Sequence, residues 1–201
     1  MLLWTEPDAQ LVAKARKGHV EAFNRLISRW EKRLYNYLLR ILSNREDSLD
    51  VCQEAFLKAY RSLGALEDAA KFPQWLFRIA HNLAFSHLRS QAAAMDRVSC
   101  PVEDWEGAAV RSTRALPHGS WRTLLGLEAE FAVAEALKTL TPEQREVIVL
   151  KVYQGFQLGE IAEILSCPLS TVKSRLYAGF AQLKEMLTAP PERSAVAERR
   201  R

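Results

Sequence analysis

The sequence is short of the residues that stabilise several other classes of protein. Its three cysteines, Cys52, Cys100 and Cys167, lie far apart and form no CxxC pair, which excludes a disulfide-rich scaffold. Glycine and proline number only 8 each, so a β-rich fold with many tight turns is not expected. No apolar run approaches the roughly 20 residues that span a bilayer, and no basic segment precedes the first apolar residues. We therefore expect a cytoplasmic protein with reduced thiols and no membrane insertion.

The sequence motifs of common enzymes are also lacking. The sequence contains no GxSxG, P-loop or GxGxxG motif. His81 and His87 are six residues apart, so they do not share a helix face as an i,i+4 pair of metal ligands would. Glu160 and Glu163 are expected to be solvent-facing charges. We predict that the protein is not an enzyme and has no catalytic residue, metal site or cofactor.

What the sequence does contain is helical periodicity in two separate segments. The chain has 201 residues, of which 48% are hydrophobic and 26% charged, as in an ordinary soluble protein. Apolar residues recur at steps of three and four before residue 90 and again after residue 130. The pattern predicts an all-α fold of two small helical domains joined by a flexible linker. The expected boundaries are an N-terminal helical bundle at 1–90, a linker at 91–130, a C-terminal helix-turn-helix bundle at 131–188 and a disordered tail at 189–201.

The charge is distributed unevenly over these segments. Residues 1–90 hold 14 basic and 10 acidic residues (+4), the linker 4 and 6 (−2), and residues 131–201 hold 10 and 8 (+2). Because binding to nucleic acid depends on phosphate neutralisation, modest basicity predicts weak DNA binding by each domain alone. The distribution favours two domains that face nucleic acid and depend on a partner to hold them in place.

Three helix starts can be predicted from capping residues. Asp8 is a candidate N-cap for the first helix, and Asp47 or Ser48 for the helix that begins near residue 48. Thr141 is followed by a proline and then by Gln144, the pattern of a capping box with proline in the first turn. We expect a helix to begin there.

The clearest functional signal is a helix-turn-helix pattern near the C-terminus. A short helix at 158–165 and a turn at 166–169 precede a long helix that begins at Ser170. Val172 and Leu176 are expected to anchor the second helix in the core. The residues left facing outward at its N-terminal end can contact phosphates or base edges, and they are Ser170, Thr171, Lys173, Ser174 and Arg175. The alternative is a plain helical hairpin with a solvated polar face.

Two further stretches carry weaker signals. Residues 71–89 interleave aromatic and cationic side chains, which suits unstacked single-stranded bases, although such a stripe is more often core. Phe72, at the end of a loop, is the best candidate there for base contact. A second stretch, at 50–58, places polar residues on one face of a helix. That face is either solvated or a docking surface for a partner. Leu49 and Tyr60 of the same helix are expected to point inward. That polar face consists of Asp50, Gln53, Glu54 and Lys58.

In this order, the motifs resemble the extracytoplasmic-function (ECF) sigma factors, which belong to the sigma-70 family of bacterial RNA polymerase sigma factors. The resemblance covers most of residues 8–187. The motifs that carry it are DVCQEAFLKAY at 50–60, WLFRIAHNLA at 75–84, LTPEQREVI at 140–148, EIAEIL at 160–165 and TVKSRL at 171–176. The helix expected at 158–165 starts with Gln157 and Leu158, whereas in much of the family this start contains serine or threonine. This difference predicts a weaker N-cap for that helix.

The resemblance implies a mechanism and a set of partners. Core RNA polymerase would bind the face that carries Asp50, Gln53, Glu54 and Lys58, and the C-terminal domain would recognise the −35 element of promoter DNA through residues 170–175. The N-terminal domain would hold a flipped base of the −10 element near the loop 66–72 and help to open the DNA. An anti-sigma factor is a further expected partner. The residues expected at the −10 element are Lys71, Phe72, Arg78, His81 and Asn82.

A second hypothesis is a helix-turn-helix transcriptional regulator that works without polymerase. It would use the same residues 170–175 on DNA. It leaves the patterns within residues 8–90 unexplained, and the chain shows no alternation of strands and helices that would indicate a receiver domain.

Overall fold

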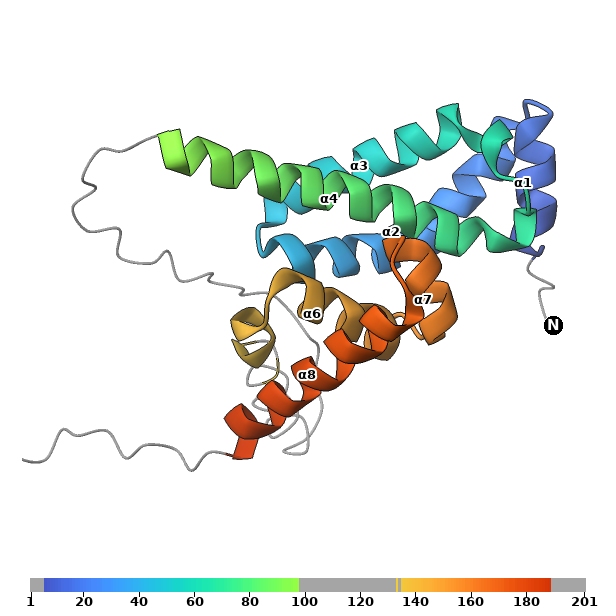
Figure 1. The fold of residues 1–201 in the computed structure, drawn as a ribbon. Helices are drawn as coiled ribbons and strands as arrows, with labels where there is room; N and C mark the ends of the chain where they lie inside the picture. The colour runs from blue at the N-terminus through green and yellow to red at the C-terminus, as the bar shows by residue number, and fades with distance from the viewer. Residues whose placement is uncertain (1–5, 98–132, 134, 189–201) are drawn as a thin grey trace, which may run out of the picture.

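The computed structural model of the chain describes residues 6–97, 133 and 135–188, and these residues form helices and no strands (Figure 1). The predicted all-α class is therefore confirmed. Most of the predicted linker and the predicted tail at 189–201 lie outside the described residues. The elements are α1 (Asp8–Arg16), α2 (Val20–Leu42), α3 (Arg45–Arg61), the 3-10 turns η1 (Leu63–Ala65) and η2 (Ala69–Lys71), α4 (Phe72–Arg97), α6 (Pro142–Ile148), the π-helical turn η3 (Val149–Tyr153), α7 (Leu158–Leu165) and α8 (Leu169–Thr188).

The N-terminal unit is a bundle in which the long helix α2 packs against α1, α3 and α4. Its amphipathic pattern buries one face of α2, with Leu26, Leu34 and Tyr37 fully inaccessible to solvent. Phe77 of α4 packs edge-on against Tyr37, with ring centroids 5.2 Å apart. Aromatic rings of this size contribute a large share of the buried area that stabilises a small bundle.

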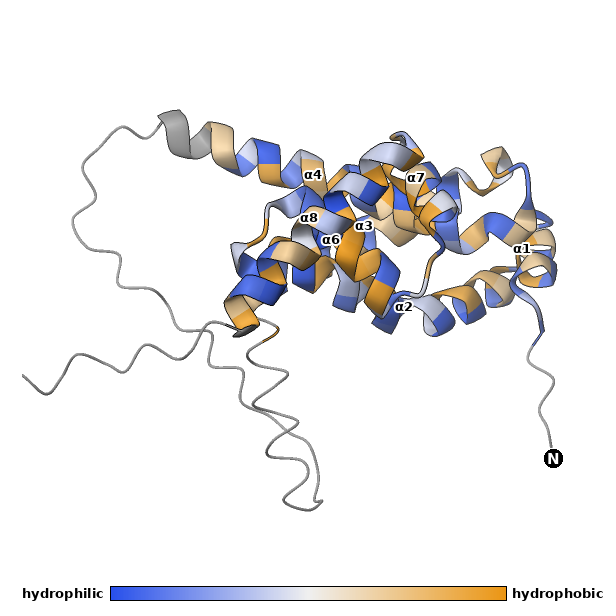
Figure 2. Cartoon of the chain, turned by 60° about the horizontal axis from the view of Figure 1, so that its bottom comes forward, coloured by the Kyte–Doolittle hydropathy of each residue, from blue (hydrophilic) through white to orange (hydrophobic). Residues whose placement is uncertain are grey.

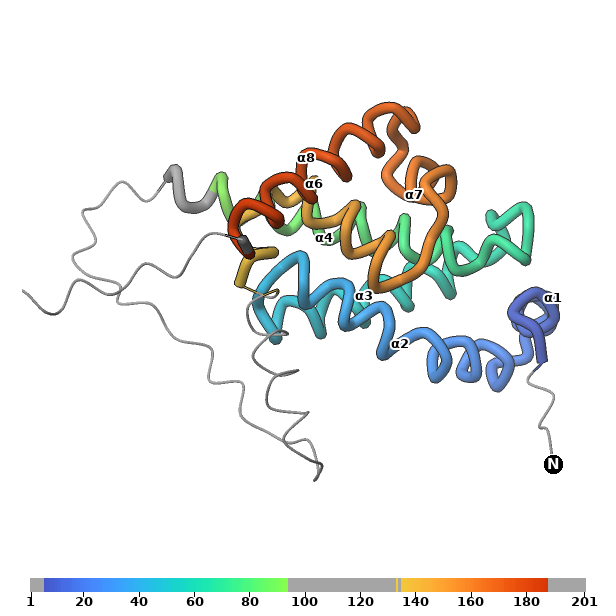
Figure 3. Tube along the Cα trace, turned by 90° about the horizontal axis from the view of Figure 1, so that it is seen from below, coloured from blue at the N-terminus to red at the C-terminus, as the bar shows by residue number. Residues whose placement is uncertain are grey.

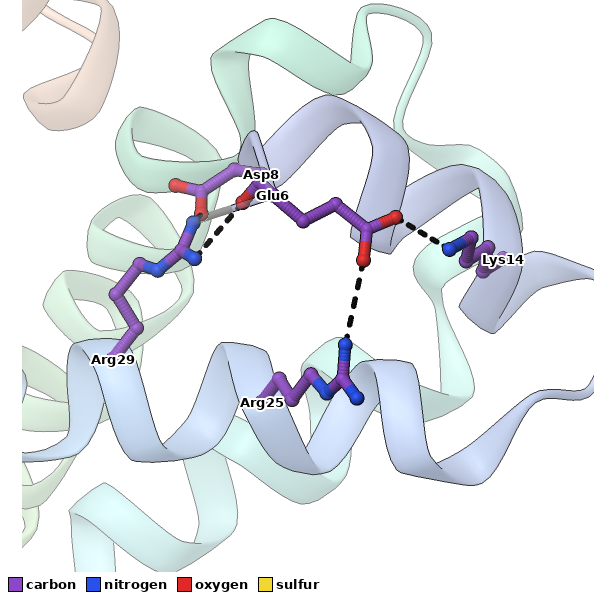
Figure 4. Close-up of polar contacts among 5 residues, drawn as sticks. All are labelled: Glu6, Asp8, Lys14, Arg25 and Arg29. Carbon is purple, nitrogen blue, oxygen red and sulfur yellow. Dashed lines mark hydrogen bonds and ion pairs between the residues drawn. The ribbon is translucent and has the colours of Figure 1, made fainter. Parts of the chain in front are cut away.

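Helix α1 is tied to α2 by charged side chains (Figure 4). Glu6 pairs with Lys14 at 2.6 Å and with Arg25 at 3.5 Å. Asp8 pairs with Arg29 and accepts a hydrogen bond from Nε1 of Trp30 at 3.0 Å. The prediction that Asp8 caps α1 is wrong, because the N-cap is Pro7 and the Asp8 carboxylate turns toward α2 instead.

Two other boundaries differ from the sequence prediction. Helix α3 begins three residues earlier than expected, because Asn44 is its N-cap and accepts from the backbone N–H groups of Glu46 and Asp47. The predicted caps Asp47 and Ser48 lie inside the helix. Helix α4 continues to Arg97, so the first seven residues of the segment expected to be linker are helical.

The C-terminal unit begins with residues 135–139 in a helical turn. The capping box at the start of α6 is confirmed: Thr141 accepts from the Gln144 backbone N–H at 3.3 Å, and the Gln144 side chain accepts from the Thr141 N–H at 3.2 Å. The chain leaves η3 through Gly155, whose φ of 79° lies in the left-handed region that glycine adopts without strain. Helices α7 and α8 follow, with a sharp turn at Ser166 between them.

The two units pack together in one continuous hydrophobic core. Helices α6 and α7 lie against α2 and α4, while α3 lies on the other side of α2 and α4 (Figures 1 and 3). Hydrophobic and hydrophilic residues alternate along the helices (Figure 2). Within the described residues, no helix is long and apolar enough to span a membrane.

The contact between Asp8 and Trp30 yields a test of how α1 is held. We expect Asp8→Ala to lower the free energy of unfolding by about 1–3 kcal/mol, because it leaves the mostly buried Trp30 N–H without an acceptor. Asp8→Asn should lose less, because its amide oxygen can still accept that hydrogen bond. Urea unfolding followed by tryptophan fluorescence measures both. Equal stabilities of Asp8→Ala and the wild type would contradict the assignment.

Candidate functional site

Helices α7 and α8 form the predicted helix-turn-helix. Ser166, at the C-cap of α7, has a left-handed backbone, and the N–H of Cys167 bonds to the carbonyl of Ala162 at 3.1 Å to close the turn. Val172 is fully buried and Leu176 is 6% exposed, so both anchor α8 as predicted. The start of α7 is capped in spite of its unusual sequence, because the Glu160 carboxylate accepts from the Gln157 N–H at 2.7 Å.

The first turns of α8 present a polar surface to solvent. Ser170, Lys173 and Ser174 are exposed, and Thr171 and Arg175 are half-buried. All five predicted −35 residues therefore lie on one end of one helix. The N-terminal end of such a helix is the part that enters a major groove and reaches base edges. This end can donate to phosphates and to base acceptors, and Lys173 and Arg175 add positive charge.

The residues predicted to contact the −10 element lie in two environments. Arg78 and Asn82, four residues apart on α4, are exposed. Lys71 bonds through its ammonium group to both oxygens of Glu163 at 3.0 and 3.2 Å, and this hydrogen bond raises the pKa of Lys71. His81 is half-buried beside α6. Phe72 is fully buried, with its ring centroid 6.2 Å from that of Trp75.

The interpretation of Glu160 and Glu163 as solvent-facing charges is confirmed for Glu163, whose side chain is 57% exposed, and wrong for Glu160, which is half-buried. The side-chain amide of Gln74 donates to Glu160 at 2.8 Å, and Glu163, although exposed, pairs with Lys71. Both carboxylates of α7 thus contact the N-terminal unit. The spacing of Glu160 and Glu163 along α7 indicates only that they lie on the polar face of that helix. Their contacts with the N-terminal unit depend on tertiary packing, which the spacing does not specify.

The loop that precedes α4 is held in place by α1. Arg16 donates from Nε to the carbonyl of Leu63 at 3.1 Å and from its terminal nitrogen to the carbonyl of Leu66. Asp68 accepts from the backbone N–H of Ala70 at 2.9 Å and caps η2. These contacts hold the backbone of the loop both before and after Glu67.

Helix α3 carries the predicted docking face. Asp50, Gln53, Glu54 and Lys58 are all exposed, while Phe56 on the opposite side of the helix is buried. The four side chains are therefore free to meet a partner, as the periodicity predicts.

Beside this face, an apolar groove of about 740 Å³ lies between α2 and α3. The expectation that Leu49 and Tyr60 point inward is wrong, because they are 43% and 45% exposed and line the groove together with Leu57, which is 56% exposed. Exposed apolar residues gathered in this way mark interaction surfaces. The groove is not visible in the sequence pattern, because its walls come from two different helices.

The family model of sigma-70 region 2 matches residues 26–94, and that of sigma-70 region 4 matches residues 130–183. The chain belongs to the sigma-70 family. The two matches correspond to the bundle that holds α3 and α4 and to the unit that holds the helix-turn-helix.

Relatives place this sigma factor among the ECF sigma factors. It is 31% identical over 179 residues to the RNA polymerase sigma-H factor of Pseudomonas aeruginosa, covering 88% of this chain and 91% of the relative. It is 34% identical over 170 residues to the ECF RNA polymerase sigma-E factor of Haemophilus influenzae, covering 85% and 89% of the two chains.

A solved structure with a similar fold is that of CnrH in complex with the cytosolic domain of CnrY. Its TM-score is 0.64 at 26% identity, covering 90% of this sigma factor and 97% of CnrH. The sigma factor RpoE from Bartonella quintana, solved in complex with the anti-sigma factor NepR, shares the fold with the same TM-score at 24% identity.

The groove of this sigma factor contains a thiol whose reactivity can be predicted. Burial raises the pKa of Cys52 to about 11, and the charge of Glu31 adds to the effect. At pH 8 only about one thiol in a thousand would be ionised, and the thiolate is the reactive form. In a Cys100→Ser/Cys167→Ser background, alkylation by iodoacetamide should be slow at pH 8 and accelerate up to about pH 11.

The urea-unfolded chain provides the control for that experiment. Its thiol should react much faster at pH 8 than the folded one, because burial no longer opposes ionisation. Equal rates for the folded and unfolded chain at pH 8 would contradict a buried Cys52.

Proposed function

We propose that this sigma factor binds core RNA polymerase, directs it to promoters by recognising −35 and −10 elements, and helps to open the DNA. The observation that carries the proposal is the exposed polar end of α8, within a chain that also matches region 2. A polymerase-independent regulator would explain α8 but would have no use for the exposed face of α3. The role is one of recognition and not of catalysis, and it is exercised in the cytoplasm, where polymerase works.

Polymerase docks on α3 in this proposal. Asp50, Gln53 and Glu54 supply acceptors and Lys58 a donor, and the adjacent groove supplies apolar area. Such a surface combines a desolvated apolar centre with a polar rim, which is how stable protein interfaces are built. A coiled coil of the largest polymerase subunit is the expected occupant.

Promoter DNA contacts both units. At the −35 element, α8 enters the major groove with residues 170–175. At the −10 element, the exposed Arg78 and Asn82 lie on the face of α4 that can track a single strand. Lys71, Phe72 and His81 flank that face. A contact between a base and Phe72 requires its ring to leave the core, since the ring is fully buried here.

A regulatory protein is a further proposed partner. Support comes from CnrH, which was solved in complex with the cytosolic domain of CnrY and covers nearly the same length of chain. An anti-sigma factor that binds this chain would compete with polymerase for the surfaces described above.

The docking face can be tested with matched double variants. Gln53→Ala/Glu54→Ala should weaken the complex with core polymerase at least about tenfold, because truncating interface residues near a buried centre costs about 1–4 kcal/mol. The control is Gln10→Ala/Glu21→Ala, which removes the same residue types from exposed positions on α1 and α2. Affinity is measured by titrating labelled chain with core polymerase.

Two outcomes would count against the docking proposal. Equal affinities of the two double variants would show that the α3 face is not the docking surface. Failure of the wild-type chain to bind core polymerase at all would favour the polymerase-independent regulator.

The −35 contact has its own test. Arg175→Ala should weaken promoter binding by the reconstituted holoenzyme by about 10- to 100-fold, since a bidentate contact to a base contributes about 1–3 kcal/mol. Lys138→Ala removes one positive charge from an exposed position beside the C-terminal half of α8, not its N-terminal end, and should have little effect. Run-off transcription on a genomic library first identifies a promoter, and footprinting then measures protection. Unchanged protection of the −35 element in Arg175→Ala would contradict the role of α8.

A further inference from the structure

The loop between α3 and α4 is anchored in the core by three buried side chains and is exposed between them. Leu63, Leu66 and Phe72 are 4%, 5% and 0% exposed. Glu67 and Asp68 lie between the last two anchors and are exposed. We refer to residues 62–71 as the α3–α4 loop. Its backbone comes to the surface directly before α4, where the proposed function places a flipped base of the −10 element.

The hydrogen bonds within this loop are local. Leu66 donates its backbone N–H to the carbonyl of Leu63 at 3.4 Å, and Lys71 donates to the carbonyl of Asp68 at 3.0 Å. The Asp68 carboxylate caps the second of these turns through the N–H of Ala70. Bonds that close single turns do not fix how one turn lies relative to the next, so that arrangement depends on a contact from elsewhere in the fold.

Arg16, in the last turn of α1, supplies such a contact. Its Nε donates to the carbonyl of Leu63 at 3.1 Å, and a terminal nitrogen donates to the carbonyl of Leu66. Within the described part of the chain, Arg16 is the residue that bonds to the backbone of this loop from a helix that is not adjacent in sequence. A guanidinium suits this task because its donors are fixed in one plane, so one side chain can hold two acceptors in a set geometry.

Helix α1 is itself held firmly on α2. Leu11 and Val12 are fully buried, and Asp8 accepts from Nε1 of Trp30 at 3.0 Å. Ion pairs between the two helices add to this attachment (Figure 4). Helix α1 also packs against the turn η2 of the loop. Because Arg16 extends from a well anchored helix, its two hydrogen bonds fix the position of the loop relative to the bundle.

The α3–α4 loop runs directly into the helix that carries the exposed Arg78 and Asn82. The turn η2 ends at Lys71 and α4 begins at Phe72, so no spacer separates the loop from the helix. A base held between them needs both walls in place before it arrives. A loop that became ordered only on binding would cost affinity, because fixing backbone dihedrals is entropically unfavourable. Walls that are fixed in advance also discriminate better between bases of different shape.

We propose that Arg16 is a positioning residue for −10 recognition. By holding the carbonyls of Leu63 and Leu66, it keeps the α3–α4 loop in the shape that accepts a flipped base, and it acts through the loop without touching DNA itself. This role extends −10 recognition to α1, which lies outside residues 26–94 that match region 2. The inference rests on the proposed function, because it refines the −10 step of that function.

Selectivity among −10 sequences is the property that this role controls. Holoenzyme is reconstituted from core polymerase and either the wild type or Arg16→Ala. Transcription is measured from the identified promoter and from versions in which one −10 base pair is replaced. Lys17→Ala is the matched control, because Lys17 is an exposed cation next to Arg16 at the C-cap of α1. Arg16 is exposed as well, so its truncation leaves no cavity in the core.

We expect the wild type to prefer its own −10 sequence over a replaced one by about tenfold or more, as mismatches in a specific site typically cost. Arg16→Ala should reduce this preference about threefold or more, because a misplaced contact group loses much of its effect. It should still bind core polymerase and protect the −35 element as the wild type does. Lys17→Ala should keep the wild-type preference. Arg16→Lys should lie between the two, because lysine keeps the charge but offers its donors at a single point.

Two results would overturn the proposal. One is an unchanged −10 preference in Arg16→Ala. The other is a uniform loss of binding across all −10 sequences that Lys17→Ala shares and Arg16→Lys fully restores, because that pattern indicates attraction of DNA by charge alone. A wild-type holoenzyme with no −10 preference would show instead that the proposed function fails at its −10 step.

A measurement on the free chain tests the contact without polymerase or DNA. With the three native cysteines replaced, a nitroxide on Glu67→Cys reports the motion of the exposed part of the loop by electron paramagnetic resonance. Arg16→Ala should narrow the spectral lines because the label moves more freely, and Lys17→Ala should leave them unchanged. Circular dichroism confirms that each variant keeps its helices. Equal spectra with and without Arg16→Ala would overturn the proposal, whether or not the chain binds polymerase.

Discussion

The packing of α6 and α7 against α2 and α4 is the constraint on which the rest of this structure depends. It converts two small helical units into one body with a continuous core. A carboxylate is costly to remove from water unless it is hydrogen-bonded, and within the described part of the chain Glu146 meets this requirement through Tyr37 and His81 of the other unit. The stability of the closed arrangement is thus linked to the partners of one side chain.

That constraint also decides which surfaces of this sigma factor are available. The α3 face and the N-terminal end of α8 point to solvent, whereas one edge of α4 is engaged. A chain that exposed all the residues proposed to contact DNA at once would be attracted to any DNA through phosphate contacts. In this structure Lys71 is paired with Glu163 of α7, which offsets part of its positive charge.

Much of the fold could be predicted from local patterns. The capping box at Thr141 and the apolar steps of α2 depend on residues within one or two helical turns, and both predictions hold. Predictions failed where a side chain finds its partner on another helix. Asp8 was expected to cap α1 and instead accepts from Trp30 of α2, and Glu160 was expected to face solvent and instead accepts from Gln74 of α4.

The sequence by itself determined the helical class, the position of the helix-turn-helix and the family, because periodicity, caps and motif order are local properties of the chain. Only the tertiary structure decided that Phe72 is buried, that a groove lies between α2 and α3, and that Glu146 joins the two units. Each of these depends on residues far apart in sequence that meet across helices. Local patterns specify which face of a helix is apolar, but they do not specify which other helix covers that face.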